Sequence, residues 1–541
     1  MTARRLRAPA TDGGLLVDPP GDEALGLLAA NAQTLTNWDY DVQGRSATWL
    51  RAQTRREVLT LAQAFLRRHG FDPGPERDAD ADADRPLVVT GHQPELFHPG
   101  VWVKNFATAG LAQAAGGLGL NLIVDNDIPK GSDIRVPALR DGRWTGVPVP
   151  FDTWHGEIPY EDWKVADESV FTTFADRARD ILNGTIAHPL LDDFWPRAVR
   201  WGREVETAGM RFSLARRAIE ADWGVANLEL PLGQLCRTEG FLWFAAHLLA
   251  QLPRYQEVHN ACLAEYRSAH RIRSRHHPVA ALGREGDWLE APFWAWRANP
   301  RARRRPLLAR QRGRTIDLRI GGEDEILAEL PLQPDGEACC AVERLRDLPA
   351  DSVRIRTRAL TTTAFARFFL GDLFLHGIGG AKYDELGDAI SARFFGIEPP
   401  GFLAISMTVR LGLPVEPVTP ADVLEIDRRL RDLTFNPDRD LPEPSSPELR
   451  KLVEEKRAAL AGPVSTRRDR VARAVALRRI NAAMQPWVAE ERAEMLERRR
   501  SILAGLRSSR MAGSREFASV LHSEDRLRRT FQDVGGWKAR S

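Results

Sequence analysis

The sequence is short of lysine and of net charge, and both shortages narrow the possible functions. Of 541 residues only seven are lysines, whereas 69 are arginines. The two side chains are interchangeable on a solvated face but not where a compact point charge is needed, so each remaining lysine is of interest. Basic and acidic side chains number 76 and 74, for a net charge of +2. This balance excludes a globally basic nucleic-acid coat and a strongly acidic solvating protein.

Cysteines and long apolar runs are also scarce. The four cysteines fit no zinc-ligand spacing, and the adjacent Cys339 and Cys340 are a poor disulfide pair, so we expect reduced thiols. The sequence has no apolar window of about 18 residues or more, so no membrane span is predicted. The first 20 residues lack the apolar stretch of a secretory signal. These shortages predict a cytoplasmic protein that does not enter a membrane.

The order of the predicted elements indicates an α/β fold with a Rossmann-like, parallel-sheet core. Residues 1–75 are predicted to form a helical N-terminal segment. A strand then starts at Pro86, passes through a polar loop at 90–100 into a helix at 101–115, and is followed by a buried strand at 121–124. A strand–helix–strand unit implies parallel strands, and sites in such sheets lie beyond the carboxyl ends of the strands.

The core is predicted to span 85–435 with helical and β insertions. Residues 190–275 show a helical pattern, and 287–357 read as strands and turns. Another apolar strand at 373–375 enters a glycine-rich loop and a helix, and 396–418 is typical of a further strand–helix step.

Residues 445–541 differ from the rest in composition. Apolar residues recur there at helical spacing among arginine, glutamate and alanine, which predicts a C-terminal helical hairpin resembling a coiled coil. From 441 onward 22 basic and 13 acidic residues give +9, so the remainder carries −7. We do not expect nucleic acid as a partner, because aromatic residues are not interleaved with the basic ones. The hairpin either forms a homodimer or packs on its own core.

The first candidate site is the loop after the first core strand. A glycine- and histidine-containing loop between a strand and a helix can place N–H groups and positive charge on a phosphate. The alternative is that its glycines only make turns and its histidines only cap the helix. The candidates are Thr90, Gly91, His92, Gln93, His98, Lys104 and Asn105.

The second candidate site is Asp125-Asn126-Asp127, with Lys130 nearby. Two carboxylates at the end of a buried strand can hold a divalent metal ion or anchor an amine. Asp and Asn are also ordinary turn and cap residues, so a structural role stays open.

The third candidate site is the glycine loop from Gly377 onward. It matches neither a Walker loop nor a dinucleotide fingerprint, but a strand precedes it and a helix follows, so backbone amides and a lysine could bind an anion. Upstream arginines could clamp a carboxylate or phosphate, or simply form a solvated basic face. The candidates are Gly377, Gly379, Gly380, Lys382, Tyr383, Arg356 and Arg358.

With these motifs, the chain resembles the bacillithiol biosynthesis cysteine-adding enzyme family over about 80–420. The stretch Leu87-Val-Val-Thr-Gly-His-Gln93 is similar to the strand and Thr-Gly-Gln-Gln of that family, and 122–135 lies where the family has an acidic loop. Residues 356–361, followed by Gly379-Gly380 and Tyr383, are similar to its Arg-Pro segment, glycine turn and tyrosine. The hairpin is predicted at the C-terminus, whereas the family has it inserted before the final core segment.

The resemblance implies a Rossmann-like core, a coiled-coil domain, a nucleotide-sized pocket for ATP or ADP, and a ligase that joins cysteine to a sugar-linked acceptor by an amide bond. An amine would attack an activated carboxylate of a small anionic substrate. His92, His98 and Lys104 would stabilise developing charge. Asp125 and Asp127 would hold the amine or a metal ion.

Two other functions stay open. The chain could be a metal-dependent glycosyl- or nucleotidyltransferase that uses Asp125-Asn126-Asp127. It could also be a non-catalytic assembly protein that binds a nucleotide while its helices dimerise.

Overall fold

The structure is a computed structural model of the chain. It describes residues 6–74, 82–272, 279–299, 303–349, 352–415, 417–439 and 446–535. The chain divides into two compact units, a core unit (1–136, 148–411 and 515–541) and a helical unit (137–147 and 412–514). No helix among the described residues is long and apolar enough to cross a membrane.

The core unit is mixed α/β and is built on a six-stranded sheet whose order is β1-β14-β13-β2-β3-β6. The five strands from β14 to β6 are parallel, and β1 pairs antiparallel with β14 at the edge. The strands are β1 (Leu15–Asp18), β2 (Leu87–His92), β3 (Leu118–Ile123), β6 (Leu228–Pro231), β13 (Leu373–His376) and β14 (Phe402–Met407).

The direction in which the chain builds the sheet reverses between β2 and β13. From β2 the chain passes through α4 (Pro99–Ala114) to β3 and later to β6 on one side, and then returns to add β13 and β14 on the other. Parallel crossovers are right-handed, so a reversal places the helices of the two halves on opposite faces and opens a crevice at the carboxyl ends of the two central strands. The site described below lies at this crevice.

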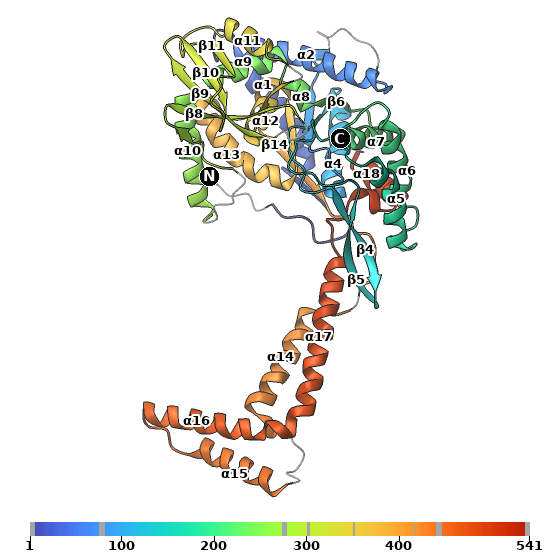
Figure 1. The fold of residues 1–541 in the computed structure, drawn as a ribbon, viewed down its shortest axis with the longest axis vertical. Coiled ribbons are helices and arrows are strands. Elements are labelled where there is room, and N and C mark those ends of the chain that lie inside the picture. The colour runs from blue at the N-terminus through green and yellow to red at the C-terminus, as the bar shows by residue number, and fades with distance from the viewer. Residues whose placement is uncertain are drawn as a thin grey trace. The chain divides into compact units, whose positions relative to one another are not determined.

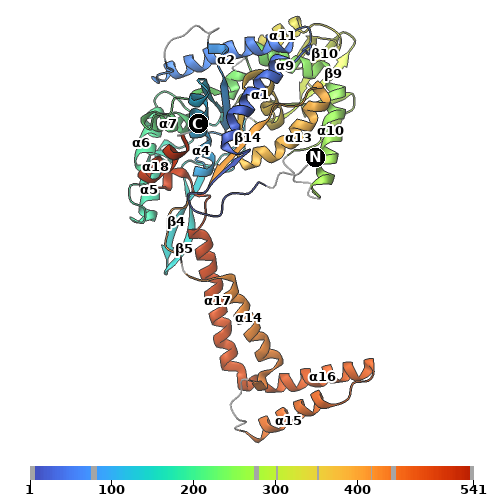
Figure 2. The ribbon, with the colours of Figure 1, turned by 180° about the vertical axis from the view of Figure 1, so that it is seen from behind.

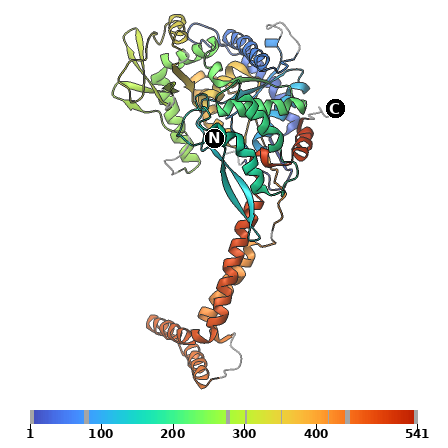
Figure 3. The same cartoon turned by 45° about the vertical axis from the view of Figure 1, so that its right-hand side comes forward.

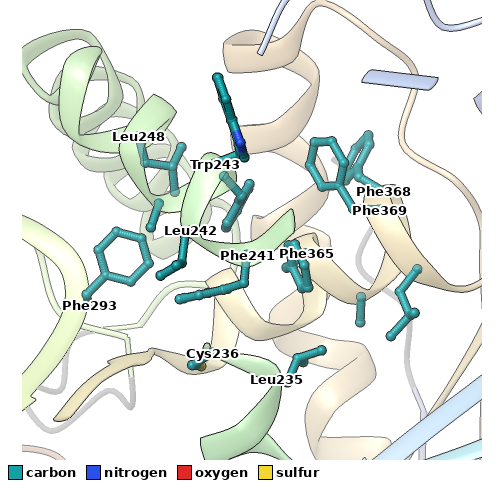
Figure 4. Packing of buried hydrophobic residues seen from close by; sticks show 14 of the residues in the cluster. Leu235, Cys236, Phe241, Leu242, Trp243, Leu248, Phe293, Phe365, Phe368 and Phe369 are labelled. Atoms are coloured by element: carbon teal, nitrogen blue, oxygen red, sulfur yellow. The ribbon is translucent and has the colours of Figure 1, made fainter. Parts of the chain in front are cut away.

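Apolar packing fixes both faces of the sheet. Leu87 and Val89 point into a large aromatic core with helices α2 (Ala47–Arg68), α9 (Glu239–Ala250) and α13 (Ile378–Phe395). Figure 4 shows the centre of this core, where the rings of Phe241 and Phe365 lie 5.5 Å apart, edge to face. Alternate strand residues face the other way, so Gly119 approaches α4. Figures 1 and 2 show α4 beside α18 (Glu524–Gly535), away from α2.

A second, antiparallel sheet belongs to the same unit, with the order β11-β10-β9-β8-β12 and β7 paired to β8. Its strands are β7 (Arg284–Glu285), β8 (Trp288–Arg297), β9 (Arg305–Arg312), β10 (Thr315–Ile320), β11 (Ala328–Pro331) and β12 (Val353–Thr357). The unit's other helices are α1 (Ala24–Thr36), α5 (Glu168–Leu182), α6 (Leu191–Trp201), α7 (Ala208–Asp222), α8 (Leu232–Leu235), α10 (Leu252–Ala269), α11 (Cys339–Arg346), α12 (Ala359–Phe365) and the π-helical turn η2 (Ala366–Leu370).

The helical unit consists of two helix pairs and the tip of a β-ribbon. Helix α14 (Pro420–Phe435) runs beside α17 (Ala489–Ala512), and α15 (Pro447–Ala461) runs beside α16 (Arg467–Met484) (Figure 3). Leu449, Ile480 and Met484 form a small core between α15 and α16. The ribbon strands are β4 (Asp133–Arg140) and β5 (Arg143–Pro150). Trp144 in β5 donates through its indole N–H to the carbonyl of Pro414 at 2.8 Å.

The structure differs from the sequence-based boundaries at three places. The N-terminal segment contains strand β1, which forms because β14 offers it a pairing edge. Strand β6 interrupts the predicted helical stretch. The sequence shows no continuous apolar run there, because the strand contains the buried Glu229. Instead of a hairpin over 445–541, the helical unit begins before α14 and ends at 514, and the chain then returns to the core unit. Residues 1–5 and 536–541 of the predicted terminal segments lie outside the described residues.

The return to the core unit has a clear physical cause. Phe531 of α18 stacks on Phe106 of α4, with ring centroids 4.4 Å apart, and packs edge to face on Trp102. A charge-rich amphipathic helix has the same sequence pattern whether its apolar stripe meets a partner helix or the core. The sequence therefore shows that 524–535 is helical but not where that helix packs.

Candidate active-site crevice at the sheet switch point

Three loops that are distant in sequence line one cavity of about 580 Å³. They follow the carboxyl ends of β2, β3 and β13, as expected for a site at a topological switch point. Of the predicted site residues, the lining contains Gly91, His92, Gln93, His98, Lys104, Asp127, Lys130, Gly377, Gly379, Gly380 and Tyr383. Six others lie outside that lining, namely Thr90, Asn105, Asp125, Arg356, Arg358 and Lys382.

Beside the end of β2 lie a buried lysine of α4, Lys104, and the half-buried His92. The ammonium of Lys104 donates to the carbonyl of Gly91 at 2.6 Å, and burial lowers its pKa to about 7. The Nδ1 atom of His92 lies 3.0 Å from the carbonyl oxygen of Gln93. A carbonyl only accepts, so Nδ1 carries the proton. Burial, and then the charge of Lys104, hold the pKa of His92 well below its usual value, so this ring is neutral near pH 7.

His98 caps α4, as the structural alternative for this loop proposed. Its Nδ1 accepts the backbone N–H of Gly100 at 3.1 Å, and its Nε2 lies 3.4 Å from a carboxylate oxygen of Glu516. Burial lowers the pKa of His98 to about 4, although Glu516 opposes the shift. The ring therefore lines the cavity as a neutral group that completes the helix end.

The start of α13 is built differently. Gly377 is the N-cap residue, and no side chain of the described residues caps the helix there. A Cβ added at Gly377 or Gly379 would meet no described atom within 4 Å. The first turn of a helix presents unpaired N–H groups and a partial positive charge. Open space in front of such a turn suits an anion.

A histidine and an aspartate that the sequence did not single out stand behind this turn. The Nε2 of His376, the last residue of β13, lies 2.7 Å from a carboxylate oxygen of Asp384 in α13. Asp384 also pairs with Arg367 at 2.7 Å and accepts the Thr363 hydroxyl at 2.7 Å. The available signal was a histidine ending an apolar strand with an aspartate eight residues later. A buried imidazole–carboxylate pair is a frequent device for proton transfer.

The two predicted carboxylates after β3 do not meet. Asp127 accepts the side-chain amide of Gln93 at 2.8 Å and pairs with Arg304 at 2.8 Å. Asp125 accepts the N–H of Gly233 at 2.9 Å and lines a separate cavity of about 810 Å³. Burial and then the charge of Glu161 raise the pKa of Asp125 to about 8, so it is protonated at neutral pH. Of these two carboxylates, Asp127 is therefore the one that faces the crevice.

The two predicted arginines already have carboxylate partners. Arg356 binds Glu161 through two hydrogen bonds of 3.0 and 2.8 Å. Arg358 pairs with Glu290 at 2.7 Å and lies 4.1 Å from the ring centroid of Trp294. Neither guanidinium is an open anion clamp.

The remaining predicted residues serve packing or lie at the surface. The hydroxyl of Thr90 donates to the carbonyl of Leu375 and joins β2 to β13. Asn105 donates to Glu220 at 2.7 Å in the packing of α4 against α7. Lys130 is exposed at the cavity rim, whereas Lys382 is exposed on α13 outside the lining.

A second cavity of about 370 Å³ adjoins the crevice. The two share Gln93, Val124 and Asp127 after β2 and β3, and Ala359 and Thr362 of α12. The walls that belong to the second cavity alone include Tyr255, His259, Trp294, Arg304 and Arg358. An extended substrate could therefore occupy both spaces.

Across the part of the chain that the structure describes, no three His, Cys, Asp or Glu side chains converge as a metal-ion site. In comparisons with known proteins, no family model matches the chain, and no curated protein matches it significantly.

Proposed function

We propose that the protein is an amide-forming ligase with a Rossmann-like core, in which an amine attacks the activated carboxylate of a small anionic substrate. One observation carries this proposal. The loops after β2, β3 and β13 converge on one cavity at the point where the strand order reverses. Switch points of parallel sheets are the usual binding places for nucleotide-sized ligands.

The electrostatics of the crevice favour an anionic ligand. The uncapped first turn of α13 faces it together with Lys130 and Lys104, and with Arg515, which pairs with Glu516, against the carboxylates of Glu95 and Asp127. Backbone N–H groups with a few cations are the donor set that binds phosphate. A nucleotide such as ATP or ADP would place its phosphates there, so the residues fit the cofactor that the resemblance implies.

The position of the helical unit supports the family that the sequence resembles. The family inserts its helical domain before the final core segment, and here 412–514 is inserted before 515–541. Cysteine as the amine, a sugar-linked carboxylate as the acceptor, dimerisation through the helical unit and a cytoplasmic location are parts of the same proposal.

The other two functions receive less support. A metal-dependent transferase would need Asp125 and Asp127 together, and these line different cavities. The function of a non-catalytic assembly protein does not require the buried imidazole–carboxylate pair beside the crevice.

The proposal is tested by ligand binding and by product formation with the full chain. Thermal-shift assays with phosphate, ADP, ATP and cysteine, each with and without Mg²⁺, should raise the melting temperature most for the phosphate-bearing ligands. The matched variants are Lys130→Met at the cavity rim and Lys382→Met outside the lining. The first should weaken the shift and the second should not.

Product formation then tests the chemistry. Incubation of the protein with ATP, cysteine and amino-sugar-linked carboxylic acids should consume ATP only when both co-substrates are present, and mass spectrometry should detect the amide. If no phosphate-bearing ligand stabilises the protein and no amide forms, the proposed function is wrong.

A further inference from the structure

We propose that His376 is the general base of the reaction, with its Nδ1 facing the crevice at the start of α13 and its Nε2 held by Asp384. The inference rests on the proposed function and adds a catalytic residue to it. It is carried by the placement of the buried His376–Asp384 pair directly behind the open helix turn.

Asp384 fixes which nitrogen of the ring carries the proton. Burial alone would raise the pKa of Asp384, but His376 and Arg367 outweigh burial and leave the pKa well below its usual value. The carboxylate is therefore ionised and accepts from Nε2–H across 2.7 Å. In a neutral imidazole the other nitrogen is then an acceptor, so Nδ1 is the basic atom.

The basic atom faces the first turn of α13 at Gly380. His376 and Gly380 both line the cavity. A Cβ built on Gly380 would lie 2.7 Å from Nδ1, closer than carbon can approach. Glycine at 380 therefore allows the first turn of α13 to pass directly beside the basic nitrogen. An amine bound next to an anion at that turn would be within reach of it.

Burial keeps the ring neutral, which leaves Nδ1 free to accept a proton. Burial lowers the pKa of His376, and Asp384 of α13 opposes this shift. Arg367 of η2 and Lys104 of α4 add to the lowering. Because the folded pKa lies below the usual value, the base is unprotonated at neutral pH and is lost only as the pH falls through that lowered pKa.

The step balances with an acyl phosphate as the activated carboxylate. The amine nitrogen forms a bond to the carboxyl carbon while one N–H proton passes to Nδ1 of His376. The bond from that carbon to the phosphate oxygen breaks, and its electron pair leaves with the phosphate. The imidazolium then returns the proton to the departing phosphate, which regenerates the base.

Activity measurements on matched variants test the role. His376→Gln keeps an amide donor near Asp384 but has no basic nitrogen, and we expect kcat to fall about 10²- to 10⁴-fold with little change in the KM of the anionic substrate. The acid limb that His376 adds to the pH–rate profile should disappear and leave only that of the attacking amine, which a purely structural role would not cause. His155→Gln, at an exposed histidine, should retain wild-type activity. A fully active His376→Gln variant would overturn the inference.

A second measurement separates this inference from the proposed function. Nitrogen-15 NMR of histidine-labelled protein, with His376→Gln to assign the signal, should show a protonated Nε2 and an unprotonated Nδ1 at pH 7. The opposite tautomer rules out the dyad even if the protein makes amides. If the tautomer is as expected but the wild-type protein makes no amide, the proposed function fails, and the role of His376 as its base fails with it.

Discussion

Two helices begin at the same crevice, and their first turns are built in opposite ways. The first turn of helix α4 is covered, because His98 accepts the N–H of Gly100 and a Cβ on Gly100 would clash with the carbonyl oxygen of Met407. The first turn of helix α13 is not covered in this way. No side chain of the described residues caps it, and a Cβ on Gly377 or Gly379 would meet no described atom within 4 Å.

The difference teaches that a strand–glycine–helix motif does not by itself reveal a binding site. Both segments have glycines and a histidine where a strand passes into a helix, and a lysine in the first turns of that helix. In α4 the glycine lets the helix pack against β14, and the histidine satisfies the helix end. In α13 the N–H groups still need partners, and the cavity supplies space for a ligand that provides them.

The largest expected effect comes from adding a side chain at Gly100, in the covered first turn of α4. Gly100→Ala places a methyl group against the backbone of Met407, which cannot rotate away as a side chain can. We expect the free energy of unfolding to fall by about 3 kcal/mol, at the upper end of overpacking costs. Urea denaturation followed by circular dichroism measures it. A loss below about 0.5 kcal/mol would mean that α4 is not held as tightly as this comparison requires.

A smaller effect is expected at the third residue of α13. Gly380→Ala would bring a methyl group within 2.7 Å of Nδ1 of His376, so the ring or the helix turn must shift. Asp384 holds the ring, and we expect a loss of stability of about 1–2 kcal/mol, together with loss of the catalytic base. Thermal unfolding and amide formation measure the two effects. An unchanged rate would show that Nδ1 does not act in the step.

The titration of Lys104 shows whether α4, whose first turn is covered, still contributes positive charge to the crevice. Its pKa of about 7 means that the ammonium is lost as the pH rises above neutrality. Phosphate affinity should therefore fall about fivefold between pH 6 and pH 9, a change of about 1 kcal/mol. Isothermal titration calorimetry measures this fall, and Lys104→Met should remove most of it.

The same lysine predicts an opposite trend for stability. Its folded pKa is depressed from the ordinary value of 10.5, so between pH 7 and 10.5 the unfolded chain binds more protons than the folded one. Stability should therefore rise with pH across that window, and the rise should be smaller in Lys104→Met. If phosphate affinity and stability changed in the same direction as the pH rises, Lys104 would not be a buried lysine with a lowered pKa.

The parallel core could be predicted from sequence because its strands are continuous apolar runs between glycine-rich loops. Leu87 to Val89 and Leu373 to Leu375 are both fully buried, as an apolar run implies. The edge strand at Leu15 and the strand with Glu229 could not be predicted. Their formation depends on a partner strand and on a buried ion pair with Arg216, which a local pattern does not reveal.

The location of the site could be predicted from the sequence, but the role of each of its residues could not. The three candidate loops follow β2, β3 and β13, and most of their predicted residues line one cavity. Which polar group faces a cavity depends on its tertiary partner. Arg356 was expected to bind an anion but binds Glu161. His376 has no local signal of its role, because the aspartate that orients it lies in the next element, α13.

The smallest expected effect is at the open turn, and it is the sharpest test of the comparison. Gly379→Ala fills space that no described atom occupies, so it should stabilise the free protein by about 0.5–1 kcal/mol through the lower entropy of the unfolded chain. The same methyl group stands where an anion would approach the helix, so phosphate affinity should fall. Thermal unfolding with and without phosphate measures both. A variant that gains stability and keeps its affinity would place the anion elsewhere, and the open start of α13 would then be only an uncapped helix end.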